Sequence, residues 1–208
     1  MPLQLWLAFV AASTVMLVMP GPTILTVISY SVVYGRHAKF PLVAAVALGD
    51  STALVVSLVG LGALFATSEF WFTAIKGAGG LYLLYLGLRL FFTKTSTAGT
   101  ARIPASRSRL GLFIHTYLVT SLNPKGVVFF IAFLPQFISP AADTDTQLWI
   151  LASTFVTLAT LNASCYAFFA NAARRLLSST DAHHRFNLAG GSLLSAAGIW
   201  ALLAQRAV

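Results

Sequence analysis

Three charged side chains interrupt long apolar stretches of this 208-residue chain: Asp50, Lys76 and Lys125. A charge at the centre of a membrane-spanning helix costs roughly 2.5–3.5 kcal/mol on insertion scales, and such residues mark ion, proton or substrate pathways. Asp50 can bind and release a proton or hold a cation, whereas the lysines can hold an anion. The sequence leaves two roles open for Asp50 and Lys125: a structural salt bridge, and a functional pair that opens and closes.

Two proline motifs lie in the same apolar stretches. The first is Met-Pro-Gly-Pro at residues 19–22, and the second is Asn-Pro-Lys at residues 123–125. Because proline lacks a backbone donor, carbonyls one turn before each motif lose their partners, and N–H groups after it become available to an anion such as a carboxylate. We therefore expect two broken helices that meet near the middle of a membrane and form a substrate site, as in several transporters. Simple packing kinks are the alternative.

Two further polar residues, Asn162 and Tyr166, lie four positions apart and share one face of a predicted helix. These two residues either line the pathway or form hydrogen bonds between helices. The candidate substrate- and proton-pathway residues are thus Pro20, Gly21, Pro22, Asp50, Lys76, Asn123, Pro124, Lys125, Asn162 and Tyr166.

The composition predicts an integral membrane protein. The chain is 58% hydrophobic and 9% charged, whereas an ordinary soluble domain is about 25% charged. A soluble fold and a disordered chain are therefore excluded, and the single cysteine, Cys165, excludes a disulfide scaffold. The net charge of +8 does not indicate a nucleic-acid partner, because too little polar sequence is present to form a basic soluble face.

Six apolar segments are long enough to cross a membrane as helices, which takes roughly 20 residues. The first and fourth are longer than a straight helix requires, and each contains a proline motif, so we expect these two helices to be broken. The first segment lacks a basic start and is too long for a signal peptide, so we expect a retained helix. The predicted spans are residues 4–33, 41–66, 70–92, 111–139, 146–172 and 186–205.

The basic residues predict the orientation of the spans. Ten of the thirteen lysines and arginines lie in or beside the loops that connect spans 1 and 2, spans 3 and 4, and spans 5 and 6. The positive-inside rule places these loops in the cytoplasm and both termini outside. The tryptophans then lie near the outer face of the membrane, as an aromatic belt does. They are Trp6, Trp71, Trp149 and Trp200.

The two halves of the sequence resemble one another. At an offset of 111 residues, the Ala-Gly-Gly of residues 78–80 matches that of residues 189–191, and at an offset of 104, Pro20 matches Pro124. Because each half contains three spans, the second half enters the membrane from the opposite side, which makes an inverted repeat. Chance similarity between glycine- and leucine-rich helices is the alternative. The predicted units of this all-α membrane domain are a first three-helix repeat over 1–92, a basic cytoplasmic linker over 93–110 and a second three-helix repeat over 111–208.

Other chemistries lack their sequence signatures. No glycine-rich phosphate-binding loop is present, which argues against ATP-driven pumping. No cluster of His, Cys and acidic residues has the spacing of a metal site. We therefore expect no cofactor, no metal and no enzymatic activity.

Five motifs occur in order along the six spans: Pro20-Gly21-Pro22, Gly49-Asp50, Lys76 followed by Gly79-Gly80-Leu81-Tyr82-Leu83 and Leu86-Gly87, Asn123-Pro124-Lys125, and Leu134-Pro135-Gln136-Phe137. Their order resembles the LysE/RhtB family of bacterial amino-acid exporters, over essentially the whole chain. A mild departure is Gly77-Ala78, where the family usually has an aromatic or alanine pair. The resemblance implies a permease of the cytoplasmic (inner) membrane that expels amino acids or close derivatives, driven by the proton-motive force.

The charges within the spans suggest how such a substrate would bind. One acid and two bases fit a neutral amino acid better than a dicationic one. We expect its carboxylate near Gly21, Pro22 and Lys125, and its ammonium near Asp50 or the carbonyls that the prolines free. Asp50 is then the proton carrier of a proton antiport, and rocking of the two repeats gives alternating access.

The expected partners are the amino acid, protons and membrane lipid, with no nucleic acid, and a homo-oligomer stays open. Two alternatives belong to other classes of protein. A non-transporting membrane scaffold or sensor partner would use the prolines only as packing kinks and would have no water-accessible path to Asp50. A passive channel would show flux that does not depend on a pH gradient.

Overall fold

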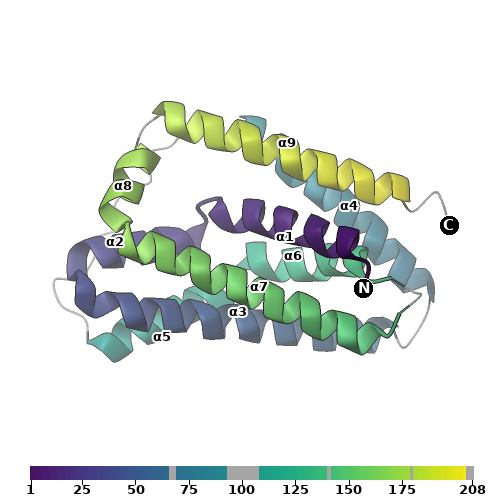
Figure 1. Ribbon diagram of the computed structural model, residues 1–208, viewed down its shortest axis with the longest axis horizontal. Coiled ribbons are helices and arrows are strands. Elements are labelled where there is room, and N and C mark those ends of the chain that lie inside the picture. Colours follow the sequence, from purple (N-terminus) through teal and green to yellow (C-terminus); the bar gives the residue numbers. More distant parts are fainter. Residues whose placement is uncertain (66–68, 93–107, 140–141, 179, 205–208) are drawn as a thin grey trace.

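The structure, a computed structural model, consists of helices, most of which run along one long axis, whereas the short helix Ala170–Ser178 crosses it at one end (Figure 1). It describes residues 1–65, 69–92, 108–139, 142–178 and 180–204, and no strand occurs within these ranges. The predicted all-α class is thus confirmed. The helices are α1 (Leu3–Val18), α2 (Pro22–Tyr34), α3 (Arg36–Phe65), α4 (Glu69–Phe92), α5 (Arg109–Ser121), α6 (Pro124–Phe133), the short 3-10 helix η1 (Leu134–Phe137), α7 (Thr144–Phe168), α8 (Ala170–Ser178) and α9 (Thr180–Ala204).

The helices overlap the six predicted spans, although α3 and α9 begin before their spans and the fifth span ends within α8. Among the described residues, α3 and α7 each contain a stretch long and apolar enough to cross a membrane, Arg36–Gly60 and Thr144–Phe168. The two bent pairs, α1 with α2 and α5 with Pro124–Phe137, pass the same test together, which gives up to four candidate spans. Helices α4 and α9, of 24 and 25 residues, occupy the third and sixth predicted spans, and their insertion stays a prediction. Most of the predicted linker, 93–107, lies outside the described residues.

Both proline motifs break the helices in which they lie, as predicted. Helices α1 and α2 meet at an angle of 54°, and α5 meets the segment Pro124–Phe137 at 42°. Each second helix begins with a proline, Pro22 in α2 and Pro124 in α6. Proline fits this position because its fixed φ is already helical and the first residue needs no N–H donor.

The helices form one bundle with α4 and α9 along one edge. These two helices lie side by side at the top of Figure 1 and form the most extensive helix contact of the described structure. Helix α3 packs against α5 and α7, and α1 and α6 lie between this group and the α4–α9 pair. The start of α1 and the end of α9 lie at one end of the bundle, whereas the turn between α2 and α3 lies at the other end, with α8.

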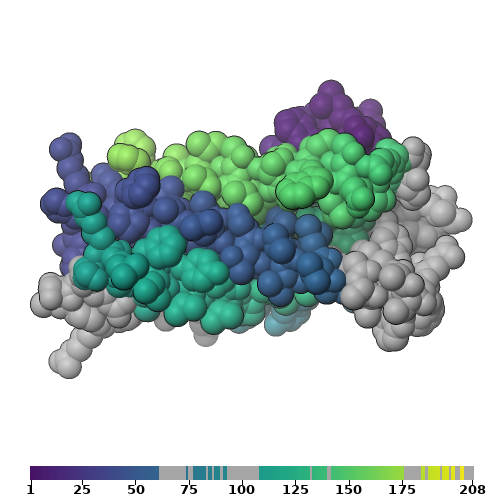
Figure 2. Space-filling model, turned by 90° about the horizontal axis from the view of Figure 1, so that it is seen from below, coloured from purple at the N-terminus to yellow at the C-terminus, as the bar shows by residue number. Residues whose placement is uncertain are grey.

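The outside of the bundle exposes large apolar side chains. Figure 2 shows the elongated face that α3, α5 and α7 form. Val56 and Val59 of α3, Leu118 of α5 and Trp149 of α7 are among the exposed apolar residues. Such side chains are expected where lipid, and not water, surrounds a helix.

Glycines bring the backbones of α4 and α9 together. A Cβ atom on Gly198 would lie 2.6 Å from the Leu84 backbone nitrogen and 2.8 Å from the Gly80 carbonyl oxygen. A Cβ atom on Gly191 would lie 2.8 Å from the carbonyl oxygen of Gly87. A larger residue would force the helices apart at these points, so the contact depends on small residues, as close helix packing in lipid generally does.

Two clusters of buried apolar side chains fill the bundle at successive levels. Along α7, Leu151 and Ala159 belong to the first cluster, and Ala163 and Ala167 belong to the second. The first, which we call the phenylalanine cluster, contains Phe9, Met16, Met19, Ala53, Leu54, Phe129, Phe130, Phe133, Leu134, Phe137, Leu151, Phe155, Ala159 and Leu194. The second, which we call the aliphatic cluster, contains Val27, Tyr30, Ala38, Leu42, Val46, Leu112, Ala163 and Ala167.

Replacing Gly49 by alanine is expected to destabilise the fold. Gly49 of α3 lies against α5, where a Cβ would lie 2.7 Å from Thr120 Cβ and 3.2 Å from the Ser121 nitrogen. Overpacking of this kind costs about 1–3 kcal/mol, which the melting temperature of the purified protein in detergent measures. Gly60→Ala in the same helix is the control, because a Cβ there meets nothing within 4 Å and alanine favours a helix by about 1 kcal/mol. Equal melting temperatures for the two variants would contradict the close α3–α5 contact.

Candidate functional site

A small cavity lies where the two breaks meet. It has a volume of about 40 Å³ and is lined by residues of α1, α2, α3, α6 and α7, including Asp50. Phe155 of its lining belongs to the phenylalanine cluster and Val46 to the aliphatic cluster, so the cavity lies between the two. It has room for a few water molecules but is far below the roughly 300–1,000 Å³ of a small-molecule pocket. In this conformation the cavity is therefore too small to hold an amino acid.

Lys125, the second residue of α6, holds the end of α1. Four consecutive carbonyl groups at residues 16–19 lose their helical donors at the break. The Nζ atom of Lys125 donates to the carbonyl oxygens of Met16 at 2.8 Å and of Met19 at 3.0 Å. The sequence offered either such carbonyls or Asp50 as the partner of a substrate ammonium. In this conformation the lysine ammonium occupies two of the carbonyls of the first break.

Asn162 and Tyr166 of α7 supply donors to the other two carbonyls. The Asn162 Nδ2 atom donates to the Leu17 carbonyl oxygen at 3.0 Å, and the Tyr166 hydroxyl donates to that of Val18 at 2.7 Å. The interhelical hydrogen bonds that the sequence left open are therefore present. All four carbonyls receive donors from the second half of the chain, so contact between the halves satisfies the carbonyls that the proline motif frees.

Asn123 caps the second broken helix and links it to the first. Its side-chain oxygen accepts a hydrogen bond from the Lys125 backbone nitrogen at 3.1 Å, and its carbonyl accepts one from Gly126 at 3.0 Å. Its side-chain nitrogen donates to the Thr23 hydroxyl in α2 at 3.2 Å. The first amides of α6 are thereby satisfied within the protein.

The N-terminus of α2 has no such cap. Its N-cap residue is Gly21, which has no side chain to accept a hydrogen bond. The amides of Thr23 and Ile24 donate to no acceptor in the part of the chain that the structure describes. All three residues line the cavity. Because free amides at a helix N-terminus bind anions, α2 is the better carboxylate-binding end of the two.

Asp50 lines the cavity without a direct partner. Its half-buried carboxylate forms no hydrogen bond, and no salt bridge with an N–O distance within 4.0 Å, to any described residue. The Lys125 ammonium interacts with it electrostatically at longer range. A direct Asp50–Lys125 salt bridge, one of the roles that the sequence left open, is thus not formed in this conformation.

Comparison with known sequences identifies the family. The profile of the family described as LysE type translocator matches residues 14–205, which include both breaks and the whole lining of the cavity. The chain belongs to this family of LysE type translocators. The resemblance inferred from the order of the motifs is confirmed. A translocator moves solutes across a membrane, so the chain is a transporter and not an enzyme.

Curated relatives match this LysE-family chain over most of its length. A homoserine/homoserine lactone efflux protein of Salmonella typhi is 29% identical over 205 residues, which cover 99% of this chain and 98% of the relative. A leucine efflux protein of Salmonella typhimurium is 29% identical over 168 residues, covering 80% and 77%. An uncharacterized membrane protein of Vibrio cholerae is 29% identical over 199 residues, covering 96% and 97%. No solved structure matches the chain.

The structure of this LysE-family chain brings five of the ten candidate residues to the cavity wall: Gly21, Asp50, Asn123, Lys125 and Asn162. Tyr166 does not line the cavity but is bonded to the end of α1. Pro20, Pro22 and Pro124 form the breaks and lie outside the lining. The side chain of Lys76 lies outside the described residues, so its role stays a prediction.

Sequence reasoning missed the other lining residues, which are Met16, Leu17, Met19, Thr23, Ile24, Val46, Gly126, Phe155 and Ala159. Thr23 directly follows the first proline motif, which was an available signal. Phe155, Ala159 and Asn162 recur at i, i+4 and i+7, the spacing of one helix face, so this periodicity identifies the side of α7 that faces the cavity. The described residues contain no group of three or more His, Cys, Asp or Glu that could hold a metal ion.

Proposed function

We propose that this protein exports a neutral amino acid or a close derivative across the bacterial cytoplasmic membrane by proton antiport. Relatives named for the efflux of homoserine and leucine, two amino acids with uncharged side chains, support the substrate class. The observation that carries the site is the unpaired Asp50 carboxylate in a cavity that also contains the uncapped N-terminus of α2. A zwitterion requires one anionic partner and one anion-binding partner.

The substrate binds between these two groups. Its carboxylate accepts hydrogen bonds from the amides of Thr23 and Ile24, where the dipole of α2 favours negative charge. Its ammonium contacts Asp50, and its side chain lies against Phe155 and Ala159. No second acidic residue lines the cavity, so a cationic side chain would have no partner. The cavity of about 40 Å³ widens before an amino acid enters.

Asp50 carries the proton in the proposed cycle. When the site opens to the cytoplasm, the charged carboxylate attracts the substrate ammonium. A proton that enters from the periplasm neutralises the carboxylate and weakens this attraction, so the substrate leaves outward. Return of the site and loss of the proton to the cytoplasm complete the cycle. Lys125 remains bonded to the end of α1 and offsets the charge of Asp50 when the site is empty.

Alternating access in this proposal rests on two inverted three-helix repeats, α1–α4 and α5–α9. The contact between α4 and α9 supports these repeats, because equivalent residues of the two halves make the same contact in both directions. A Cβ on Gly80 would meet Leu202, and a Cβ on Gly191 would meet Phe91. Gly191 and Leu202 are the counterparts of Gly80 and Phe91 at the offset of 111. Rocking of such repeats opens a central site to each side of the membrane in turn. In this proposal the phenylalanine cluster closes the site toward one side, and the aliphatic cluster closes it toward the other.

Both termini are periplasmic in this proposal. The starts of α3 and α5 and the whole of α8 lie at one end of the bundle (Figure 1), and they carry Arg36, Arg109 and Arg175. Helix α7 starts at the opposite end, with Asp145 in its first turn. The positive-inside rule favours the first of these ends for the cytoplasm.

Inside-out membrane vesicles with an acid interior test the proposal. Their interior corresponds to the periplasm, so export is measured as uptake of labelled leucine or homoserine together with loss of the pH gradient. We expect uptake that an uncoupler abolishes and that vesicles without the protein do not show. No uptake of any amino acid by correctly inserted protein would favour the scaffold, and uptake that ignores the gradient would favour the channel. Lysine taken up as fast as leucine would reject the neutral substrate class.

A further inference from the structure

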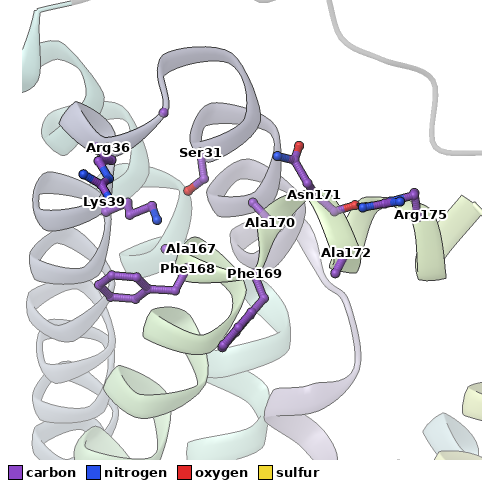
Figure 3. A pocket seen from close by; sticks show the side chains of 11 residues that line it. Ser31, Arg36, Lys39, Ala167, Phe168, Phe169, Ala170, Asn171, Ala172 and Arg175 are labelled. Carbon is purple, nitrogen blue, oxygen red and sulfur yellow. The ribbon is translucent and has the colours of Figure 1, made fainter.

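A second, larger pocket lies at the end of the bundle that carries the basic residues. It has a volume of about 340 Å³ and lies where the turn between α2 and α3 meets the junction of α7 and α8 (Figure 3). The aliphatic cluster separates it from the cavity beside Asp50, because Ala167 of that cluster lines the pocket and Val46 lines the cavity. The pocket is therefore distinct from the proposed transport site.

The charged residues of the pocket lining are all basic: Arg36, Lys39 and Arg175. The Lys39 Nζ atom lies 4.4 Å from the centroid of the Phe168 ring, a cation–π contact. Neither Arg36 nor Lys39 forms a hydrogen bond or a salt bridge with a residue that the structure describes. The pocket therefore selects an anion. A zwitterionic amino acid fits poorly, because its ammonium would find no acid.

Ser31 adds an unsatisfied hydroxyl to the pocket. Its side chain is 5% exposed, and its Oγ atom has no hydrogen-bond partner in the described structure. In Figure 3 the hydroxyl points toward the space above the Phe168 ring, which the Lys39 ammonium also faces. Buried hydroxyls are normally hydrogen-bonded, so this one indicates a ligand with acceptor atoms. The N-terminus of α3, which begins at Arg36, adds the positive end of a helix dipole.

The rim of the pocket is apolar. Phe168 and Phe169 are 63% and 68% exposed, and Phe40, next to Lys39 on α3, is 83% exposed. Apolar side chains this exposed at the end of a membrane helix are expected to contact lipid acyl chains close to the headgroups. Basic residues beside apolar ones at this level recognise lipid headgroups, whereas a pocket for a free anion needs no apolar rim.

We propose that this pocket binds the phosphate of an anionic phospholipid. The phosphate oxygens accept hydrogen bonds from Arg36, Lys39 and Ser31, and the acyl chains lie along Phe168 and Phe169. Because the α2–α3 turn belongs to the first half of the chain and the α7–α8 junction to the second, the bound lipid connects the two halves at the basic end of the bundle.

Native mass spectrometry of the purified protein, titrated with phosphatidylglycerol in neutral detergent, tests this proposal. The R36Q/K39Q variant is expected to bind about 25-fold more weakly, since each basic residue near a membrane surface contributes about fivefold. The control is R174Q/R185Q, which removes two exposed basic residues that do not line the pocket. It is expected to bind like the unmodified protein, and K39R is expected to keep most of the affinity.

Other probes separate the lipid from other anions. Phosphatidylcholine and inorganic phosphate are expected to bind more weakly than phosphatidylglycerol. The F169A variant is expected to bind phosphatidylglycerol more weakly but inorganic phosphate as the unmodified protein does. If inorganic phosphate binds as tightly as the lipid, the proposal of a phospholipid ligand is wrong, and the pocket is a site for free phosphate. If R36Q/K39Q and R174Q/R185Q lose equal affinity for phosphatidylglycerol, the pocket is not the lipid-binding site. The readout is binding, so either failure is distinct from a failure of the proposed export.

Discussion

Export driven by a pH gradient is expected to fail in the Asp50→Asn variant. Asparagine has nearly the same size as aspartate, but it neither carries a proton nor attracts the substrate ammonium by charge. A hydrogen bond to a charged group contributes about 1.5–3 kcal/mol, which corresponds to a loss of about 10- to 150-fold in substrate affinity. Proton movement coupled to uptake is expected to disappear. The fold is expected to persist, because the Asp50 carboxylate forms no hydrogen bond or salt bridge with a described residue.

Uptake and proton flux in inside-out vesicles measure this effect, with Asp145→Asn as the matched control. Asp145 is exposed in the first turn of α7 and does not line the cavity, so its variant loses the same charge away from the site. We expect that control to transport like the unmodified protein. If Asp50→Asn shows proton-coupled uptake at the rate of the unmodified protein, Asp50 is not the proton carrier. Equal losses in both variants would point to a general effect of charge on the inserted protein.

The positions of the helices and of both breaks could be predicted because local physics determines them. Lipid offers no partners to backbone groups, so apolar segments of membrane length form helices. The proline motifs at residues 19–22 and 123–125 break two of these helices, because proline removes a backbone donor. The predicted span over 4–33 accordingly corresponds to α1 and α2, with the break at Pro20. The expected meeting of the two breaks is present in the hydrogen bond between Asn123 and Thr23.

The hydrogen-bond partners of the first break could not be predicted in the same way. The donors to the α1 carbonyls lie more than 100 positions further along the chain, and only the packing of α6 and α7 against α1 brings them there. Lys125 was therefore expected beside a substrate carboxylate, although it bonds to carbonyl oxygens. The different caps of α2 and α6 were predictable in principle, since Asn123 has a capping side chain and Gly21 has none.

The Lys125→Met variant is expected to unfold at a lower temperature and to lose export. Methionine has a similar length but no donor, so the carbonyls of Met16 and Met19 lose their partners. A buried carbonyl without a donor costs about 1–3 kcal/mol, and removal of a buried charge offsets part of this, so we expect a net loss of about 2 kcal/mol. The control is Tyr166→Phe, which removes one neutral donor from the adjacent Val18 carbonyl. It is expected to cost about 1 kcal/mol and to retain export.

The double variant Asp50→Asn/Lys125→Met separates the two roles open to this pair. If the two charges formed a structural salt bridge, removing both would restore the stability that Lys125→Met loses, as neutral replacement of buried ion pairs often does. We expect only a small part of that stability to return, because the direct partners of Lys125 are carbonyl oxygens and Asp50 interacts with it only at longer range. Melting temperatures of both single variants and the double variant give the coupling energy. A coupling as large as the loss in Lys125→Met would establish the salt bridge. A small coupling means that Asp50 can exchange a proton for a substrate ammonium without disturbing the end of α1, which a proton carrier requires.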